Sequence, residues 1–216
     1  MILNIKKPKG ISSHGVVGRI RKITGEKRVG HGGTLDPFAE GVLVIGVGRE
    51  STKKLGVILK GTDKEYLATI ELGRTSTTGD SEGELRRAVE EEVVLQIKRE
   101  TIEKALLKFR GEILQTPPIY SALKVQGQPA YRLARAGKNF VLPERKVRIK
   151  ELEILEFVPP RLKLKVVVSS GTYIRTLAED IGRALGVGAY LKELLRTRVG
   201  QFKVEESKTL EELEDV

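Results

Sequence analysis

The stretch GHGGTLDPFAEGVLVIGVG, residues 30–48, joins a glycine-rich segment to an apolar run. Proline lacks an amide hydrogen and keeps the residue before it out of helical geometry, so Asp36-Pro37 indicates a loop, which we expect over residues 30–41. The run GVLVIGVG, residues 41–48, is typical of a buried strand. The sequence therefore predicts one carboxylate, Asp36, in a loop fixed to a rigid strand.

The segments around this stretch alternate between helical and strand patterns. Capped by Ser12 or Ser13, a helix with apolar residues at helical spacing is predicted up to Gly25, and a second helix is predicted over residues 101–111, ending at Gly111 as its C-cap. A third helix is predicted over residues 173–186. Further strands are predicted over residues 2–6, 65–73, 145–157 and 161–170, and polar or loop-rich segments over 74–84 and 115–137. Strands interrupted by isolated helices predict an α+β fold with a largely antiparallel sheet.

Positive charge is concentrated in three blocks of the chain. The net charge is +10, and residues 1–60 hold 12 Lys or Arg against 4 Asp or Glu. Residues 121–150 hold 8 against 1, and residues 161–203 hold 9 against 3. Such blocks favour a surface that binds a phosphate backbone, although ion pairs of the kind found in thermophilic proteins also raise the count of charged residues.

Composition excludes several classes of function. The chain has no cysteine and only two histidines, which excludes disulfides and makes a structural zinc site improbable. The first apolar run is three residues long, and no stretch approaches the length of a membrane span. We therefore expect a cytoplasmic protein with no membrane association, whose 216 residues form a single domain.

Residue chemistry alone leaves the role of the glycine-rich stretch open. Asp36 reads as an ordinary turn aspartate or as a reactive group that the neighbouring glycines expose to a substrate. For His31, a packing or capping role is as consistent with the sequence as a role as a ligand. A GxSxG nucleophile elbow and a GxxxxGK[ST] phosphate loop are both absent, so a serine hydrolase and a P-loop NTPase are not favoured.

Six motifs in order resemble the TruB family of tRNA pseudouridine synthases. The stretch from residue 30 to residue 53, GHGGTLDPFAEGVLVIGVGRESTK, is similar to the catalytic motif of that family, GHxGTLDPxAxGVL. The other five are KKPKGISS, KEYLATIELGRTSTTGDSEG, PPIYSALKVQGQPAYRLARAG, SSGTYIRTLAEDIG and LKELLRTRVGQF. The resemblance implies the pseudouridine synthase fold, a largely antiparallel mixed β-sheet flanked by helices and loops, with a loop-rich insertion near residues 115–140.

The resemblance assigns roles to individual residues. It implies that Asp36 is the nucleophile, that Tyr66 stacks on the flipped base and is implicated in removing its C5 proton, and that Arg175 pairs with the aspartate. Asp80 matches a second acid that shares this arginine. Residues matching substrate-binding positions of the family are His31, Tyr173, Leu194, Lys7 and Lys124.

These roles imply isomerisation of uridine 55 in the T loop of tRNA without guide RNA. A base stacked in a folded loop must be extruded, and a guanidinium keeps a partly buried carboxylate ionised. Because one nucleotide is rearranged without redox or group transfer, no metal or organic cofactor is implied. We expect a monomer whose partner is the T arm of tRNA.

Departures from the family pattern leave two alternatives. Lys6, Gly32 and Thr77 replace residues common in the family, and the sequence stops after TLEELEDV, where members usually continue into a small C-terminal RNA-binding (PUA-like) domain. We therefore expect residues 1–216 to form only the catalytic domain.

The alternatives to the predicted function are a guide-RNA-dependent synthase, whose family generally lacks the insertion, and a tRNA-folding chaperone with secondary catalysis.

Overall fold

The computed structural model describes residues 1–214, which divide into two compact units. Unit 1 comprises residues 1–67, 165–170 and 193 onward, and unit 2 comprises residues 68–164 and 171–192. Three strands contribute residues to both units: β4 (Lys64–Leu72), β11 (Arg161–Val168) and β12 (Ala189–Val199).

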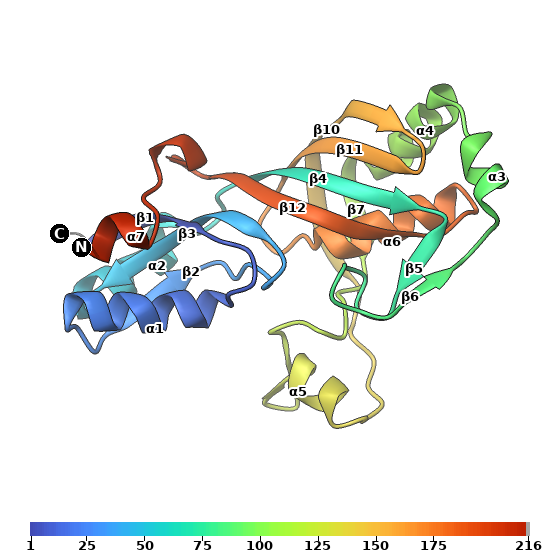
Figure 1. Cartoon of the computed structure of the whole chain (residues 1–216). Helices are drawn as coiled ribbons and strands as arrows, with labels where there is room; N and C mark the ends of the chain where they lie inside the picture. Colours follow the sequence, from blue (N-terminus) through green and yellow to red (C-terminus); the bar gives the residue numbers. More distant parts are fainter. Residues whose placement is uncertain (215–216) are drawn as a thin grey trace. The chain divides into compact units, whose positions relative to one another are not determined.

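The remaining elements of unit 1 come from the two ends of the chain (Figure 1). They are β1 (Ile2–Lys7), α1 (Ser13–Thr24), β2 (Val29–Gly32), β3 (Glu40–Val47), α2 (Arg49–Ile58), β13 (Phe202–Lys203), the 3-10 turn η2 (Val204–Glu206) and α7 (Glu211–Glu214).

The remaining elements of unit 2 lie in the middle of the sequence. They are β5 (Arg74–Ser76), β6 (Leu85–Arg87), α3 (Glu91–Leu95), α4 (Arg99–Leu106), the 3-10 turn η1 (Leu107–Phe109), β7 (Gly111–Gln115), β8 (Lys124–Val125), β9 (Gln128–Pro129), α5 (Ala130–Arg135), β10 (Arg145–Val158) and α6 (Ile174–Ala184).

One mixed sheet of nine strands dominates the topology. Its path runs β1-β3-β12-β4-β11-β10-β7, with β2 added to β3 and β13 added to β12. Strands β1 and β2 both pair antiparallel with β3, and β7 pairs antiparallel with β10. Strand β12 pairs parallel with β3, at Leu195↔Glu40 and Arg196↔Gly41. The predicted α+β class with a largely antiparallel sheet is confirmed.

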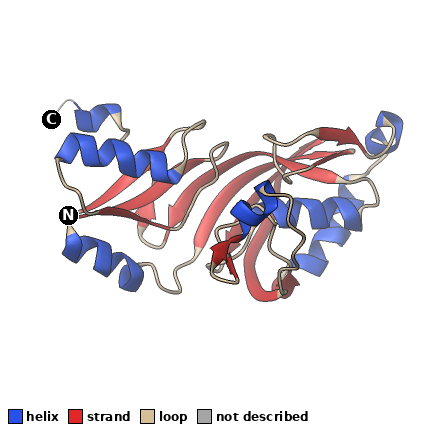
Figure 2. Ribbon diagram, turned by 90° about the horizontal axis from the view of Figure 1, so that it is seen from below, coloured by secondary structure: helices blue, strands red, loops and turns tan. Residues whose placement is uncertain are grey.

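Helices cover both faces of the strands of unit 1 (Figure 2). One face carries α1 and the residues around α7, and the other carries α2. The first cluster is built from Ile5, Val16, Val17, Ile20, Leu43, Ile45 and Leu210, all of them buried. The second is built from Val42, Val44, Leu55 and Val199. Burial of each large aliphatic side chain contributes about 1.5–3 kcal/mol, so the strand β3, apolar on both faces, is the anchor of unit 1.

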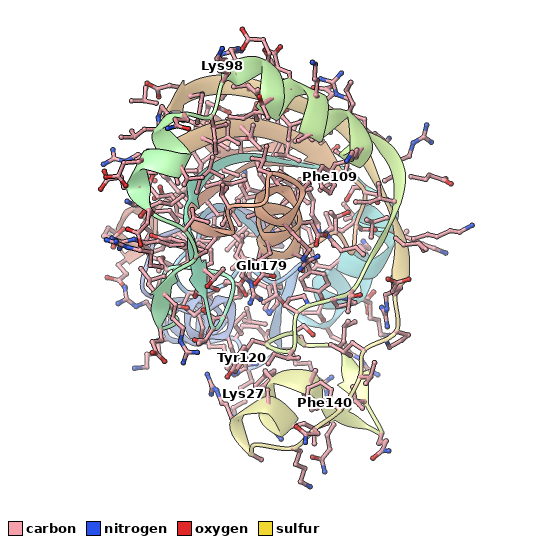
Figure 3. All side chains as sticks on the ribbon, turned by 90° about the vertical axis from the view of Figure 1, so that its right-hand side faces the viewer. Lys27, Lys98, Phe109, Tyr120, Phe140 and Glu179 are labelled. Atoms are coloured by element: carbon pink, nitrogen blue, oxygen red, sulfur yellow. The ribbon has the colours of Figure 1, made fainter. Side chains whose placement is uncertain are left out.

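The first predicted helix is confirmed at both ends. Ser12 is the N-cap, and its hydroxyl accepts a hydrogen bond from the Gly15 amide at 3.0 Å. Gly25 follows the last helical residue with a φ of 66°, the left-handed conformation expected of a C-cap glycine. The end of the second helix was predicted wrongly: α4 stops at Leu106, and a 3-10 turn continues to Phe109, labelled with the N-cap Lys98 in Figure 3. Gly111, with a φ of 85°, opens β7 instead.

Three segments predicted as loops or as loop-rich contain strands, one of them residues 115–137 with β8 and β9. Residues 29–32 form β2, in which His31 lies opposite Ile45, so the loop that carries Asp36 is shorter than predicted. Residues 74–87 form the hairpin β5-β6. Strands β2 and β5 are short and contain glycine or polar residues, so their sequences do not indicate that they pair with β3 and β6. Within residues 1–214, no helix has the length and apolar character needed to cross a membrane.

Candidate functional site

The loop of residues 33–39 holds Asp36 between two buried anchors. Leu35 and Phe38 are buried on either side of it, and the Ala39 amide donates to the Asp36 carbonyl at 3.1 Å, which closes a turn around Pro37. The Ser13 hydroxyl donates to the Leu35 carbonyl at 2.9 Å and accepts from the Leu35 amide at 2.8 Å. Apolar anchors and buried hydrogen bonds make this loop a fixed platform for the partly buried carboxylate.

Lys7 fastens the same loop from the N-terminal side. Its side chain is fully buried, and the ammonium donates to the carbonyls of Pro8, Ile11 and Pro37 at 2.8, 2.7 and 3.2 Å. The third of these carbonyls belongs to the residue directly after Asp36. Lys7, predicted as a substrate-binding residue, therefore lies beneath the aspartate loop, where its charge is solvated by backbone carbonyls.

Arg196 fastens the loop from the other side and was not predicted. This side chain, also fully buried, extends from β12 and donates to the carbonyls of Val42 (2.8 Å), Thr34 (3.3 Å) and Gly33 (3.0 Å). The guanidinium thus ties the start of the aspartate loop to β3. The backbones also lie close, because a Cβ at Gly41 would be 2.2 Å from the Arg196 carbonyl oxygen.

Three other predicted site residues belong to unit 1. Tyr66 is buried on β4, where it shares one face of the strand with Ala68 and Ile70. Leu194 is buried on β12, two residues before Arg196. His31 is partly buried on β2, and its Nδ1 atom is buried without a hydrogen-bond partner.

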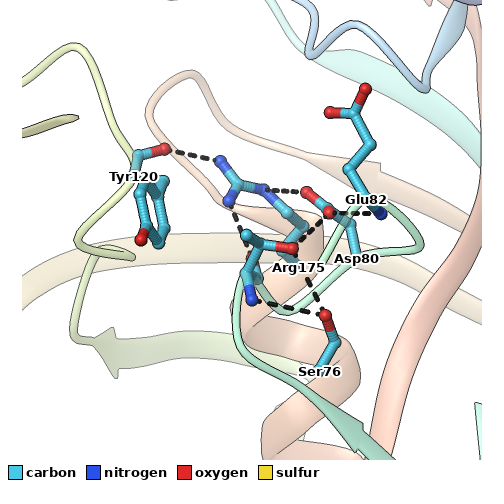
Figure 4. A network of polar contacts seen from close by, with 6 residues as sticks. Ser76, Asp80, Glu82, Tyr120 and Arg175 are labelled. Carbon is cyan, nitrogen blue, oxygen red and sulfur yellow. Dashed lines mark hydrogen bonds and ion pairs between the residues drawn. The ribbon is translucent and has the colours of Figure 1, made fainter. Parts of the chain in front are cut away.

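Arg175 and Asp80 meet in unit 2, as the sequence predicted. Their side chains are each 5% exposed, and Arg175 Nε lies 3.6 Å from Asp80 Oδ2 (Figure 4). Arg175 also donates to the carbonyls of Thr78 at 3.0 Å and Tyr120 at 2.8 Å. Asp80 accepts from the Thr78 hydroxyl at 2.5 Å and from the Glu82 amide at 3.0 Å. The ion pair is therefore held by hydrogen bonds to both partners, the arrangement that a buried pair requires.

Tyr173 and Lys124 occupy contrasting environments in unit 2. Tyr173 is the N-cap of α6, where its amide donates to Gln115 Oε1 at 2.8 Å and its carbonyl accepts from Gln115 Nε2 at 3.0 Å. The buried Gln115 thereby fixes the start of the helix that carries Arg175. Lys124 is exposed on β8.

Burial and neighbouring charge shift the pKa of several groups near these residues. Burial, with additional contributions from the Arg196 and His14 charges, lowers the pKa of His31. Burial, followed by the Arg196 charge, lowers the pKa of Lys64 to about 8. In unit 2, burial and then the Asp180 carboxylate raise the pKa of Glu179, labelled in Figure 3. Within residues 1–214, no group of three or more His, Asp or Glu side chains is placed to hold a metal ion.

The predicted site residues divide between the two units. Unit 1 carries Asp36, Tyr66, His31, Lys7 and Leu194, and unit 2 carries Asp80, Arg175, Tyr173 and Lys124. The predicted pairing of Asp80 with Arg175 lies within unit 2 and is present. The predicted pairing of Arg175 with Asp36 joins residues of different units and stays a prediction.

Comparison with solved structures gives the class of protein. A Cbf5-Nop10-Gar1 complex contains a chain that is 34% identical over 99% of this chain, with a TM-score of 0.75. The Nop10-Cbf5 complex of an archaeal box H/ACA sRNP gives 31% identity over 99% of this chain and a TM-score of 0.71. This chain spans about half of each matched chain, 53% and 52%. These matches support the predicted pseudouridine synthase fold.

Curated relatives and family matches define the family. tRNA pseudouridine synthase B of Francisella tularensis subsp. tularensis (strain WY96-3418) is 46% identical over the whole chain, which covers 70% of that protein. The protein of the same name from Mycobacterium sp. (strain KMS) is 50% identical over 99% of the chain and 72% of its own length. Residues 21–174 match the N-terminal domain of the TruB family pseudouridylate synthases, and residues 175–216 match the tRNA pseudouridylate synthase B C-terminal domain. The chain belongs to the TruB family.

Proposed function

We propose that the protein converts a uridine of tRNA to pseudouridine, at position 55 of the T loop, without a guide RNA. The observation that carries the proposal is the similarity of the whole of this chain to enzymes named tRNA pseudouridine synthase B, at 45–50% identity, together with the six motifs given above. We further propose that it acts as a cytoplasmic monomer. The basic blocks of the sequence would supply the contacts to tRNA phosphates.

Asp36 is the proposed nucleophile. The reaction breaks the bond between C1′ of the ribose and N1 of uracil, forms a bond between C1′ and C5, removes the C5 proton and returns a proton to N1. A carboxylate acts as a nucleophile only when ionised and correctly placed. The platform under Asp36, fastened at Leu35, at Pro37 and at Gly33 and Thr34, supports this role because it removes freedom that the carboxylate would otherwise lose on reaching the substrate.

Tyr66 and Arg175 have the supporting roles in the proposal. A flipped base needs an aromatic partner, and the buried Tyr66 on a sheet strand would give its ring a fixed position. Arg175 is held rigidly by carbonyls and by Asp80, so its positive charge is pre-placed and costs no reorganisation during the reaction. Tyr173, Leu194, His31, Lys7 and Lys124 would bind or position the RNA.

The experiment that tests this function maps pseudouridine in an unmodified tRNA transcript. The transcript is incubated with the protein alone, with no guide RNA, metal or organic cofactor added, and every uridine is examined at single-nucleotide resolution. A transcript with cytidine at position 55 serves as the control for site choice. We expect modification at position 55 and none in the control. Binding without modification would contradict the proposal and favour the guide-dependent or chaperone alternatives.

A further inference from the structure

Two cationic side chains and a histidine, from three strands of unit 1, lie around Gly33. The Lys64 ammonium of β4 and Arg196 Nη1 of β12 lie 3.3 and 3.7 Å from the point where a Cβ of Gly33 would be. His31 is two residues away on β2, and the Arg196 charge contributes to lowering its pKa. No acidic side chain of the described residues forms an ion pair with Lys64 or Arg196. Two cations therefore lie close together, and neither forms an ion pair with an acidic side chain of residues 1–214.

The partners of these groups leave the surplus charge in place. Arg196 donates only to three backbone carbonyls, which satisfy its hydrogen bonds but carry no net charge. The Lys64 ammonium has no hydrogen-bond or ion-pair partner within residues 1–214. The next residue, Glu65, lies on the opposite face of β4, where it pairs with Lys165 and Arg198.

His31 adds an unused hydrogen-bonding group. Among the residues that the structure describes, its buried Nδ1 has no hydrogen-bond partner, so the imidazole keeps a hydrogen-bonding atom that the fold does not use. Gly33 has a φ of 80° and no side chain, so the Lys64 ammonium can lie close to the backbone at the centre of the cluster. These features describe a site for an anion with several acceptor oxygens.

We propose that Lys64 and His31, together with the charge of the buried Arg196, bind one phosphodiester group of the RNA strand beside the loop that carries Asp36. This inference rests on the proposed function and names a contact that the reaction would need. A phosphate has the required negative charge and oxygen acceptors, and RNA carries one at every nucleotide. The anchor would hold the strand next to the nucleophile while the target base is turned out.

Burial and charge give this site a pH dependence. Lys64 has a pKa of about 8 in the free protein, lowered by burial and then by Arg196, while burial, Arg196 and His14 lower the pKa of His31. A bound phosphate would raise both pKa values because it favours the charged forms. RNA binding is therefore linked to proton uptake, and the affinity should fall as the pH rises through about 8.

The test measures the dissociation constant for an unmodified tRNA transcript across pH and salt. The variants are Lys64→Gln, Lys64→Arg and the control Lys104→Gln, which removes the same charge from an exposed position on α4. Near pH 7 we expect Lys64→Gln to weaken binding by about tenfold and to reduce the salt slope by about one, the effect of one lost phosphate contact. Above pH 8 the affinity of Lys64→Gln for tRNA should fall much less with rising pH than the affinity of the wild type.

Lys64→Arg separates charge from shape. The guanidinium stays protonated over the whole range, so this variant should bind near the wild-type level at about pH 7 and bind more tightly than wild type at about pH 9. Lys104→Gln should retain the wild-type affinity, salt slope and pH profile. Thermal unfolding of each variant checks that the fold is intact.

Competition with inorganic phosphate shows whether the site binds RNA or a free anion. Phosphate that competes with tRNA in the wild type, but not in Lys64→Gln at the same ionic strength, supports the proposal. Phosphate that stabilises the protein through Lys64 without affecting tRNA binding would indicate a free-anion site and overturn it. Wild-type affinity, salt slope and pH profile in Lys64→Gln would also overturn it. Pseudouridine formation by the same samples tests the proposed function separately. If the protein is active but Lys64→Gln binds tRNA as the wild type does across pH and salt, only the phosphate contact is contradicted.

Discussion

Two buried arginines, one in each unit, are held in opposite ways. Arg175 in unit 2 lies beside the carboxylate of Asp80 and donates to two carbonyls. Arg196 in unit 1 donates to three carbonyls and, within residues 1–214, pairs with no carboxylate, and the Lys64 ammonium lies near it. One guanidinium is neutralised by the chain, and the other leaves a positive surplus beside the aspartate loop.

The two arginines show that the partners of a buried charge decide what that charge can do. A buried ion pair is stable only while both partners are present, because either charge alone is costly to bury. A buried cation that is solvated by neutral carbonyls keeps its charge: burial is the main cause of the lowered pKa values of Lys64 and His31, and the Arg196 charge lowers both further. We infer that unit 2 uses the ion pair to hold the Arg175 charge in a fixed position and that unit 1 uses Arg196 both to fix the loop and to attract an anion.

Removing the arginine of the ion pair should have the largest effect on stability. Arg175→Met leaves Asp80 without its cation and two carbonyls without donors, which should lower the free energy of unfolding by about 3–5 kcal/mol. Urea denaturation measures this change. The control Arg183→Met lies on the same helix with a side chain that is 76% exposed, and should cost less than about 1 kcal/mol. Equal losses for the two variants would contradict the role given to the Arg175–Asp80 pair.

Removing the unpaired arginine should cost less and should change the titration of its neighbours. Arg196→Met leaves three carbonyls without donors but also relieves repulsion, so we expect a loss of about 2–3 kcal/mol. The pKa of His31, followed by NMR, should rise yet remain below its ordinary value because burial persists. Arg198→Met, two residues along β12, is the control. An unchanged His31 titration in Arg196→Met would show that this arginine has no surplus field.

A methyl group at the centre of the positive cluster should have the smallest effect. Gly33→Ala introduces a side chain at a φ of 80° and 3.3 Å from the flexible Lys64 ammonium, and should destabilise the fold by about 1–2 kcal/mol. The control is Gly18→Ala in α1, where nothing lies within 4 Å of the new Cβ and alanine should stabilise the helix. Thermal denaturation should give opposite signs, and the same sign for both would contradict the strain assigned to Gly33.

Periodicity predicted the parts of the fold that repeat a simple pattern. Strand β3 is a continuous apolar run, and α1 has a serine cap and a terminal glycine, so both could be read from local residues. The end of α4 was missed because the apolar spacing continues through Phe109 while the backbone has already changed to a 3-10 turn. The short strand β2 was missed because its pairing with β3 is a tertiary contact.

Family motifs assigned chemical roles to named residues but did not point to the residues that support them. Asp80 and Arg175 were assigned by resemblance, and the structure confirms that they meet. Lys64 and Arg196 were overlooked, although one signal was available. Arg196 lies two residues after Leu194 on a strand, so its side chain points to the same buried face. An arginine is rarely buried there without hydrogen-bond partners, which indicates a structural or functional role.

The most direct test of the account follows the C5 proton of the target nucleotide. A tRNA transcript carrying tritium at C5 of its uridines is incubated with the protein, with Asp36→Asn and with the exposed control Lys104→Gln, and tritium released to water is counted. The account predicts rapid release by the wild type and the control, and a rate lower by about 10³-fold or more in Asp36→Asn. Release by Asp36→Asn at the wild-type rate, or tight tRNA binding by the wild type with no release, would contradict it.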